Sequence, residues 1–154
     1  MIVDTSFPAD LSEIKDASIL ANELGFDGIF AAEVKSDPFV ASAVASQHAP
    51  GMDLGTKIAV AFARTPMTTA YAAHGLNELS GGRFHLGLGT QVRAHITRRF
   101  SMPWSQPTVR MREYVVAMKE IWESWRTNEP LAFKGEFYEH SLMTEYFVPE
   151  TRTQ

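Results

Sequence analysis

A short apolar run followed by a stretch of helically spaced apolar residues recurs four times along this chain. The four apolar runs, which we predict as strands, are Met1 to Asp4, Gly28 to Ala32, Thr56 to Phe62 and Phe84 to Leu88. Strands that alternate with helices are typical of βα units, whose strands lie parallel in one sheet. The alternation therefore predicts an α/β fold built on a parallel sheet. A chain of 154 residues is long enough to bury a sizeable core in such a fold.

Capping residues mark where the first two predicted helices begin. Asp10 and Glu13 form a capping-box pattern ahead of a helix that we expect to run to about Gly25. Asp37-Pro38 places an N-cap before a proline at the first helical position, which predicts a second helix through about Gln47. Each helix follows a predicted strand, in the order that βα units require.

The third and fourth predicted helices are defined by a start signal and by an apolar stripe. Thr65-Pro66 repeats the plan of the second helix and begins a third, which we expect to end at Ser80. The fourth helix carries one apolar stripe, made of Tyr114, Val115, Met118, Ile121, Trp122 and Trp125. We interpret this aromatic stripe as core packing and not as a cofactor site.

The segment Leu79 to Gln91 has the pattern of a helix stop, a tight turn, a buried strand and a glycine-bearing strand end. Gly81-Gly82 is a turn signal, because glycine takes positive φ after a helix without a steric penalty. Gly87 and Gly89 lack side chains at the strand end, which leaves room for a flat ring against the main chain. The alternative is that both glycines serve packing or a turn.

Composition and charge limit the classes of function. The chain has 14 Lys and Arg against 18 Asp and Glu, a net charge of −4 that does not favour a general nucleic-acid-binding role. Without cysteine, disulfides, thiolate catalysis and cysteine-ligated metals are excluded. His48, His85 and His140 lack metal-ligand spacing, so we expect no metal. No segment is apolar over the length that spans a bilayer, and we expect a cytoplasmic protein.

Several segments together carry a resemblance to a known family. They are Leu24 to Phe30, Glu33 to Phe39, Leu54 to Thr56 followed by Ala61 to Pro66, and Leu79 to Phe84 followed by Gly87 to Gly89. In order and spacing they resemble the luciferase-like flavin and deazaflavin oxidoreductases, and most closely the branch that uses coenzyme F420. The resemblance extends over nearly the whole chain, and its most specific piece is Ser80 to Phe84 with the glycine-bearing strand.

The resemblance implies a (β/α)8 TIM barrel, whose usual length is about 250 residues. The four predicted βα units match the N-terminal half of such a barrel, as one partial domain over residues 1–154. An aromatic-rich C-terminal excursion follows, with Phe133, Phe137, Tyr138, Tyr146 and Phe147. A half barrel has two open strand edges and an uncovered inner face. We therefore expect a truncated family member, with a homo-oligomer or a complementing second half-barrel as partner.

The resemblance also implies where the site lies, because the active sites of such barrels form at the C-terminal ends of the strands. Glu33 ends the second strand, where related deazaflavin enzymes often place an acid or a histidine near the reactive ring. It is our candidate catalytic residue, to position substrate or to exchange a proton. The alternative is a capping or surface salt-bridge role. Val34 stands where relatives often carry histidine.

Candidate cofactor-binding residues follow the third and fourth strands. The family commonly has a non-prolyl cis peptide behind the cofactor ring, in a place that matches residues 58–62, and we predict it at Ala59-Val60. Ala59, Val60 and Ala61 are therefore candidate cofactor contacts, together with Gly89, Thr90 and Gln91. Some deazaflavin enzymes carry a catalytic glutamate just after the fourth strand, where this chain has Gln91-Val92.

Arginines dominate the loop after the fourth predicted strand. Six arginines and no acidic residue lie from Arg83 to Arg112. Because arginine binds phosphate and carboxylate groups bidentately, Arg93, His95 and Arg98 are our candidates for binding substrate or another anion. The alternative is a solvated face with arginines at helix ends.

Together these expectations give a hypothesis of function. The resemblance implies an oxidoreductase that moves a hydride between coenzyme F420 and a small organic substrate. The first alternative is an FMN-dependent monooxygenase on the same fold, and the second is a non-catalytic half-barrel that serves interaction or oligomerisation. Nucleic-acid binding through the arginine-rich loop is disfavoured because stacking aromatics are sparse around those arginines. We expect no membrane partner.

Overall fold

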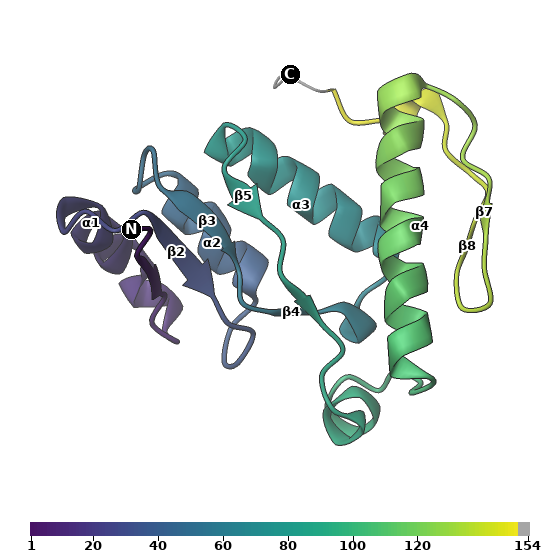
Figure 1. The fold of residues 1–154 in the computed structure, drawn as a ribbon, viewed down its shortest axis with the longest axis horizontal. Helices are drawn as coiled ribbons and strands as arrows, with labels where there is room; N and C mark the ends of the chain where they lie inside the picture. The colour runs from purple at the N-terminus through teal and green to yellow at the C-terminus, as the bar shows by residue number, and fades with distance from the viewer. Residues whose placement is uncertain (151–154) are drawn as a thin grey trace. The chain divides into compact units, whose positions relative to one another are not determined.

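The computed structural model describes residues 1–150, which group into two compact units (Figure 1). Unit 1 consists of Met1–Ala59 and Ala72–Gly89, and unit 2 consists of Val60–Tyr71 and residues 90–150. The last four residues of the predicted single domain, 151–154, lie outside the described part of the chain. The single-domain interpretation stays a prediction.

Unit 1 is built on a four-stranded parallel sheet in the order β1 (Asp4–Ser6), β2 (Gly28–Ala31), β3 (Asp53–Thr56), β5 (Phe84–His85). Helix α1 (Ile14–Glu23) follows β1, and α2 (Pro38–Ser46) follows β2. Parallel neighbours joined through helices confirm the predicted βα units.

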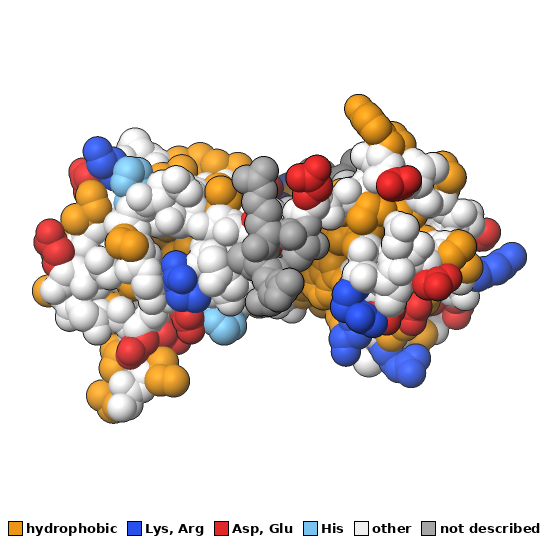
Figure 2. Space-filling view, turned by 90° about the horizontal axis from the view of Figure 1, so that it is seen from above, with side chains coloured by type: hydrophobic (Ala, Val, Ile, Leu, Met, Phe, Trp, Pro, Cys, Tyr) orange, Lys and Arg blue, Asp and Glu red, His pale blue; other side chains and the backbone are white. Residues whose placement is uncertain are grey.

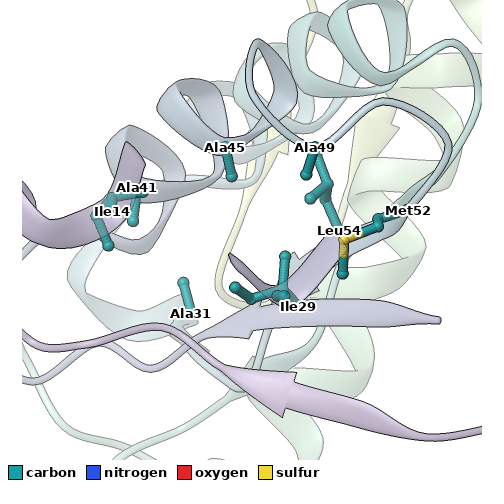
Figure 3. Packing of buried hydrophobic residues seen from close by; sticks show 9 residues of the cluster. Ile14, Ile29, Ala31, Ala41, Ala45, Ala49, Met52 and Leu54 are labelled. Atoms are coloured by element: carbon teal, nitrogen blue, oxygen red, sulfur yellow. The ribbon is translucent and has the colours of Figure 1, made fainter. Parts of the chain in front are cut away.

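The core of unit 1 lies between the sheet and these two helices. One hydrophobic cluster contains Ile14, Ala21, Ile29, Ala31, Ala41, Ala45, Ala49, Met52 and Leu54. Figure 3 shows Ala45 of α2 on the side toward which Ile29 of β2 points. Since alternate residues of a strand face opposite sides of a sheet, Gly28 and Phe30 lie on the face turned away from the helices.

The predicted starts of the first two helices are confirmed. The Asp10 carboxylate accepts a hydrogen bond from the Ser12 N–H at 2.9 Å, and a 3-10 turn (Leu11–Glu13) leads from there into α1. The Asp37 carboxylate accepts a hydrogen bond from the Phe39 N–H at 2.8 Å, with a proline in the first turn. Each carboxylate satisfies an N–H group that has no partner within its own helix.

The third helix has the predicted bounds. Helix α3 (Pro66–Ser80) has its first residues in unit 2 and the rest in unit 1. Gly81 and Gly82 follow it at φ of +64° and +86°. Their N–H groups donate to the Glu78 and Asn77 carbonyls at 3.2 and 2.8 Å, which is the pairing of a Schellman C-cap. The predicted glycine turn is therefore confirmed.

The first and third strands differ from their predicted bounds. β1 begins at Asp4 and not at Met1, because its register pairs Asp4 with Gly28, where β2 begins. β3 ends at Thr56, which is paired with Ala31, the last residue of β2. The pairing with β2 sets both of these strand limits. The apolar pattern of a single segment carries no information about that pairing, so it could not predict them.

The chain after β3 corrects the predicted strand from Thr56 to Phe62. It forms a short strand β4 (Ala59–Val60) and a 3-10 turn (Ala61–Ala63). The predicted fourth strand is likewise divided into β5 and β6 (Leu88–Gly89), and β6 pairs with β4. At this pairing the Ala59 N–H donates to the Gly87 carbonyl at 2.8 Å.

Unit 2 contains helix α4 (Pro107–Thr127) and the aromatic stripe that was predicted on it. Tyr114, Ile121 and Trp125 are buried, which confirms the core interpretation for these residues. Val115, at the margin of the stripe, is exposed. The Tyr114 hydroxyl donates to the Thr65 carbonyl at 2.9 Å, so this buried polar group has a hydrogen-bond partner.

The aromatic-rich excursion forms an antiparallel hairpin of β7 (Phe133–Lys134) and β8 (Glu139–His140), which lies along α4 in Figure 1. The Glu113 carboxylate of α4 accepts hydrogen bonds from three consecutive N–H groups of the hairpin turn. The donors are Glu136 at 2.9 Å, Phe137 at 2.8 Å and Tyr138 at 2.7 Å. One side chain therefore ties the hairpin to the helix.

Hydrophobic side chains reach the surface at several places between charged ones (Figure 2). Leu20 of α1 and Leu24, directly after α1, are 54% and 65% exposed. Within residues 1–150, none of the helices combines the length and the apolar composition that crossing a membrane requires.

Candidate functional site

The C-terminal ends of the parallel strands of unit 1 meet at one end of the sheet, which is where the sequence predicts a site. Glu33 lies two residues after β2 and is partly buried. Its N–H donates to the Ile58 carbonyl at 3.3 Å. The candidate acid is therefore attached through its main chain to the bend that follows β3, and its carboxylate is not needed for this link.

The bend after β3 contains a non-prolyl cis peptide, between Lys57 and Ile58. The predicted position, Ala59-Val60, is wrong by two residues, because β3 ends at Thr56 and the chain turns directly after it. The Lys57 N–H donates to the Ala31 carbonyl at 2.6 Å, which holds the start of the bend against the end of β2.

The predicted cofactor contacts at this bend are buried. Ala59, Val60 and Ala61 are each 0% exposed, whereas Ile58 is 37% exposed. The exposed apolar side chain at the bend is thus one residue earlier than the predicted contacts. Sequence reasoning missed Ile58 because strand periodicity alone does not indicate where a chain leaves its sheet.

The two glycines of the strand end pack closely against the same bend. A Cβ at Gly87 would collide with the Thr56 carbonyl, and one at Gly89 would lie 2.7 Å from the end of the Ile58 side chain. On the side where a Cβ would project, both glycines are therefore close-packed, as the packing interpretation predicts. A flat ring has access to their backbone only from another side.

The polar loop that follows β6 belongs to unit 2. Thr90 and Gln91 are partly buried, and Gln91 has a positive φ of +59°. The Gln91 side-chain oxygen accepts a hydrogen bond from the Val92 N–H at 2.9 Å, and the Thr90 hydroxyl donates to the Gln91 carbonyl at 3.1 Å. Both candidate side chains thus stabilise the turn in which they lie.

A short π-helix (His95–Arg99) follows in the same loop, and it carries most of the candidate anion-binding residues. Arg93, His95 and Arg98 are exposed, while Ile96 is fully buried and anchors the helix. These three side chains are therefore open to solvent. That exposure is compatible with an anion site and equally with a solvated face.

Two of the six arginines from Arg83 to Arg112 have structural roles. Arg83 donates to the Met52 carbonyl at 3.2 Å. Arg110 is only 6% exposed; it donates to the Tyr138 hydroxyl at 2.8 Å and to the Pro103 carbonyl at 2.7 Å. Its position in the first turn of a helix with a buried aromatic stripe is the signal that could have revealed this role.

A hollow of about 530 Å³ lies beside the segments that follow β1 and β2. Asp10, Glu13 and Lys35 line it together with small and apolar residues. Hydrogen bonds from the backbone and then the hydroxyl of Ser12 lower the pKa of the Asp10 carboxyl, and the Lys35 charge lowers it further. The hollow is therefore lined by both acidic and basic side chains. Its residue Lys35 lies two residues after Glu33, beyond the end of β2.

Among residues 1–150, no group of three or more His, Cys, Asp or Glu side chains is arranged to hold a metal ion.

The family model of luciferase-like monooxygenases matches residues 3–153. The chain belongs to this family.

Individual relatives extend the same result. An uncharacterized protein of Mycobacterium tuberculosis is 48% identical over 148 residues, which are 96% of this chain and 44% of that protein. A putative coenzyme F420-dependent oxidoreductase of the same organism is 32% identical over 126 residues, 81% of this chain and 35% of that protein. This luciferase-like chain thus spans less than half the length of the curated relatives that it matches.

The fold is shared with solved luciferase-like enzymes. The oxygenating constituent of 3,6-diketocamphane monooxygenase from Pseudomonas putida, solved in complex with FMN, matches with a TM-score of 0.79 at 15% identity. The match covers 94% of this chain and 45% of that enzyme. The predicted family and the predicted fold, the N-terminal half of a (β/α)8 barrel, are both confirmed.

Proposed function

We propose that this chain is part of an oxidoreductase that moves a hydride between coenzyme F420 and a small organic substrate. The observation that carries the proposal is the hydrogen bond from Glu33 to Ile58, which joins the candidate acid to the bend at the C-terminal end of the sheet. The description of the 32% identical relative as a putative coenzyme F420-dependent oxidoreductase supports this choice. When bound, the deazaflavin supplies the hydride chemistry, and the protein supplies orientation and charge.

In this proposal the planar ring of the cofactor lies against the bend after β3. Ile58 is its exposed apolar side chain, and we assign to it the surface that backs the ring. Ala59, Val60 and Ala61 are buried and act by fixing the course of the bend. Gly89 leaves the space that the Ile58 side chain occupies.

The polar candidates take distinct roles in this proposal. Glu33 positions the substrate or holds a proton, from its place just beyond the C-terminal end of β2. Within unit 2, Thr90 and Gln91 are our candidates for hydrogen bonds to polar atoms of a ligand, in addition to the bonds that they make within their own turn. In unit 2, the exposed side chains of Arg93, His95 and Arg98 bind an anionic group such as a phosphate or a carboxylate.

The test is an equilibrium titration of the purified chain with coenzyme F420 and, in parallel, with FMN, followed by cofactor fluorescence. We expect saturable binding of the deazaflavin and at least tenfold weaker binding by Ile58→Asp. Ile2→Asp is the matched control, since Ile2 is 81% exposed near the chain start and should leave affinity unchanged. If Ile58→Asp binds the deazaflavin as tightly as the wild type does, the assigned contact is contradicted.

Two alternatives are separated by the same titration. Binding of FMN alone would favour a reduced-flavin monooxygenase, an option supported by the fold match to an enzyme solved with FMN. Binding of neither cofactor would favour a non-catalytic half-barrel that serves interaction or oligomerisation. A cytoplasmic location stays a prediction.

A further inference from the structure

The hollow of about 530 Å³ lies between two segments of unit 1 that follow neighbouring strands. Residues 9–11 and Glu13 line it from the segment after β1, and Lys35 and Ser36 line it from the segment after β2. Because β1 and β2 are paired and parallel, both segments leave the sheet at the same end. Glu33 lies at this end too, and the hollow has the size of a small-molecule site.

One carboxylate of the hollow is held in a fixed orientation. The Ser12 N–H and the Ser12 hydroxyl donate to the same oxygen of Asp10, Oδ1, at 2.9 and 2.8 Å. Among residues 1–150, the other oxygen, Oδ2, accepts no hydrogen bond. The bond from the Ser12 backbone, and then that from its hydroxyl, lower the pKa of the Asp10 carboxyl, because both favour its ionised form. Asp10 therefore offers an anionic oxygen to a ligand.

The hollow also contains a cationic side chain that is not ion-paired. Lys35 is exposed, and it lies near enough to Asp10 for its charge to lower the pKa of that carboxyl. Among the described residues, however, Lys35 makes no direct ion pair with Asp10, with Glu13 or with any other acid. Two acids and one base therefore line one small space without neutralising one another by direct contact.

This set of charges discriminates between classes of ligand. A ligand with a lone carboxylate is attracted by Lys35 but repelled by Asp10 and Glu13. A ligand with a lone ammonium group is attracted by the two acids but repelled by Lys35. Because only a ligand with both groups can place each of them beside an opposite charge, the hollow favours a zwitterion.

The uncharged residues of the hollow suit a small molecule of this kind. Ser36 follows Lys35 directly and adds a hydroxyl group, which can donate a hydrogen bond to a carboxylate. Leu11 is 41% exposed and, together with Ala9, adds apolar surface for the carbon atoms of a ligand. The lining therefore combines charged groups of both signs with a short apolar wall.

We propose that this hollow binds the zwitterionic end of the substrate, an ammonium group and a carboxylate a few atoms apart as in an α-amino acid. Asp10 and Glu13 bind the ammonium group, and Lys35 binds the carboxylate. Lys35 lies two residues after Glu33, and two residues of chain span at most about 7 Å. The bound end thus lies close to the candidate acid, which favours a small substrate. That the ligand is the substrate rests on the proposed function, whereas its binding in the hollow does not.

The first test is a titration of the cofactor-free, isotope-labelled chain with three matched probes, followed by its amide signals in NMR spectra. The probes are L-alanine, propionate, which lacks the amine, and ethylammonium, which lacks the carboxylate. Because exposed ion pairs are weak, we expect millimolar affinity for L-alanine, with saturable shifts at residues 9–13 and 35–36. Propionate and ethylammonium should bind at least about fivefold more weakly. Lack of saturable shifts with L-alanine up to about 100 mM, or equal binding of a singly charged probe, would overturn the proposal.

Variants that remove one charge test each side chain through its effect on selectivity. Asp10→Asn keeps a helix-capping side chain without the charge, so it should lose the preference for L-alanine over propionate. Lys35→Met should lose the preference for L-alanine over ethylammonium, which a merely structural role would not change. Lys15→Met, exposed on α1 outside the hollow, is the matched control and should bind all three probes as the wild type does.

Wild-type selectivity in either Asp10→Asn or Lys35→Met would overturn the assignment of the two charges. None of these measurements uses coenzyme F420, so failure of the hollow to bind L-alanine is distinguishable from failure of the proposed reaction.

Discussion

Thr56 and Gly87 are joined by two hydrogen bonds through one hydroxyl group. The Thr56 hydroxyl donates to the Gly87 carbonyl at 2.7 Å, and the Gly87 N–H donates to the same hydroxyl oxygen at 2.9 Å. This pair fastens the end of β3 to the chain between β5 and β6. Because the main chains lie so close, the position has no room for a side chain.

Gly87→Ala should lower the free energy of unfolding by about 3 kcal/mol, because its Cβ collides with the Thr56 carbonyl, which is backbone and cannot rotate away. Gly75→Ala in α3 is the matched control, since no atom lies within 4 Å of its Cβ position. That change should stabilise the chain by about 0.5–1 kcal/mol through helix propensity. Urea unfolding followed by circular dichroism measures both, and equal effects of the two variants would contradict the packing role of Gly87.

Arg110→Leu should destabilise the chain by about 2–3 kcal/mol, because it leaves the Pro103 carbonyl and the Tyr138 hydroxyl without their donor. It also removes the guanidinium stacked 4.4 Å over the Phe62 ring. Arg112→Leu, at an exposed position on the same helix, should change stability by less than about 0.5 kcal/mol. Denaturant unfolding measures the free energy of unfolding of both variants. A small effect of Arg110→Leu would mean that water replaces the hydrogen bonds of Arg110 and would contradict the prediction.

The stability of unit 2 should decrease as the pH falls from 7 toward 5. Burial lowers the pKa of His140 from its usual 6.5, and its Nε2 is buried without a hydrogen-bond partner. The unfolded chain therefore takes up this proton more readily than the folded chain, so the stability is present above pH 6.5 and is lost as the pH falls toward the folded pKa.

Thermal unfolding across this pH range tests the assignment. His140→Leu should have a flatter acid limb than the wild type. His95→Gln, at an exposed position, should retain the wild-type slope. If His140→Leu keeps the full acid dependence, another group is responsible for it.

Glu33→Gln should bind coenzyme F420 as the wild type does but lose at least about 100-fold in turnover, if the carboxylate exchanges a proton with the substrate. The hydrogen bond from Glu33 to Ile58 uses the main chain, so the amide leaves the bend intact. Glu120→Gln, exposed on α4, is the matched control. Steady-state kinetics of the cofactor-loaded protein tests this, and turnover that survives Glu33→Gln would assign Glu33 a structural role.

Several features were predictable because they depend on neighbours in the sequence. Asp37 caps a helix through an N–H two residues away, and Gly81 and Gly82 form a C-cap with carbonyls of the last turn. The family was predictable for a related reason, since its motifs are short segments whose order and spacing can be compared directly.

The candidate site was predictable in outline only. Glu33 was expected at the end of β2, and it lies two residues beyond it. The cis peptide was expected at Ala59-Val60 and lies at Lys57-Ile58, because the pairing of β3 with β2 determines where the strand stops. Arg110 and Arg93 belong to the same arginine-rich stretch, yet only packing separates the buried one from the exposed one.

The sequence by itself determined the alternation of strands and helices, the starts of the helices and the family, because local hydrogen bonds and apolar periodicity are encoded within short windows. Only the tertiary structure decided the strand bounds, the exposure of Ile58 and the lack of space at Gly87. These features depend on register and close packing between segments up to thirty-one residues apart, as for Thr56 and Gly87.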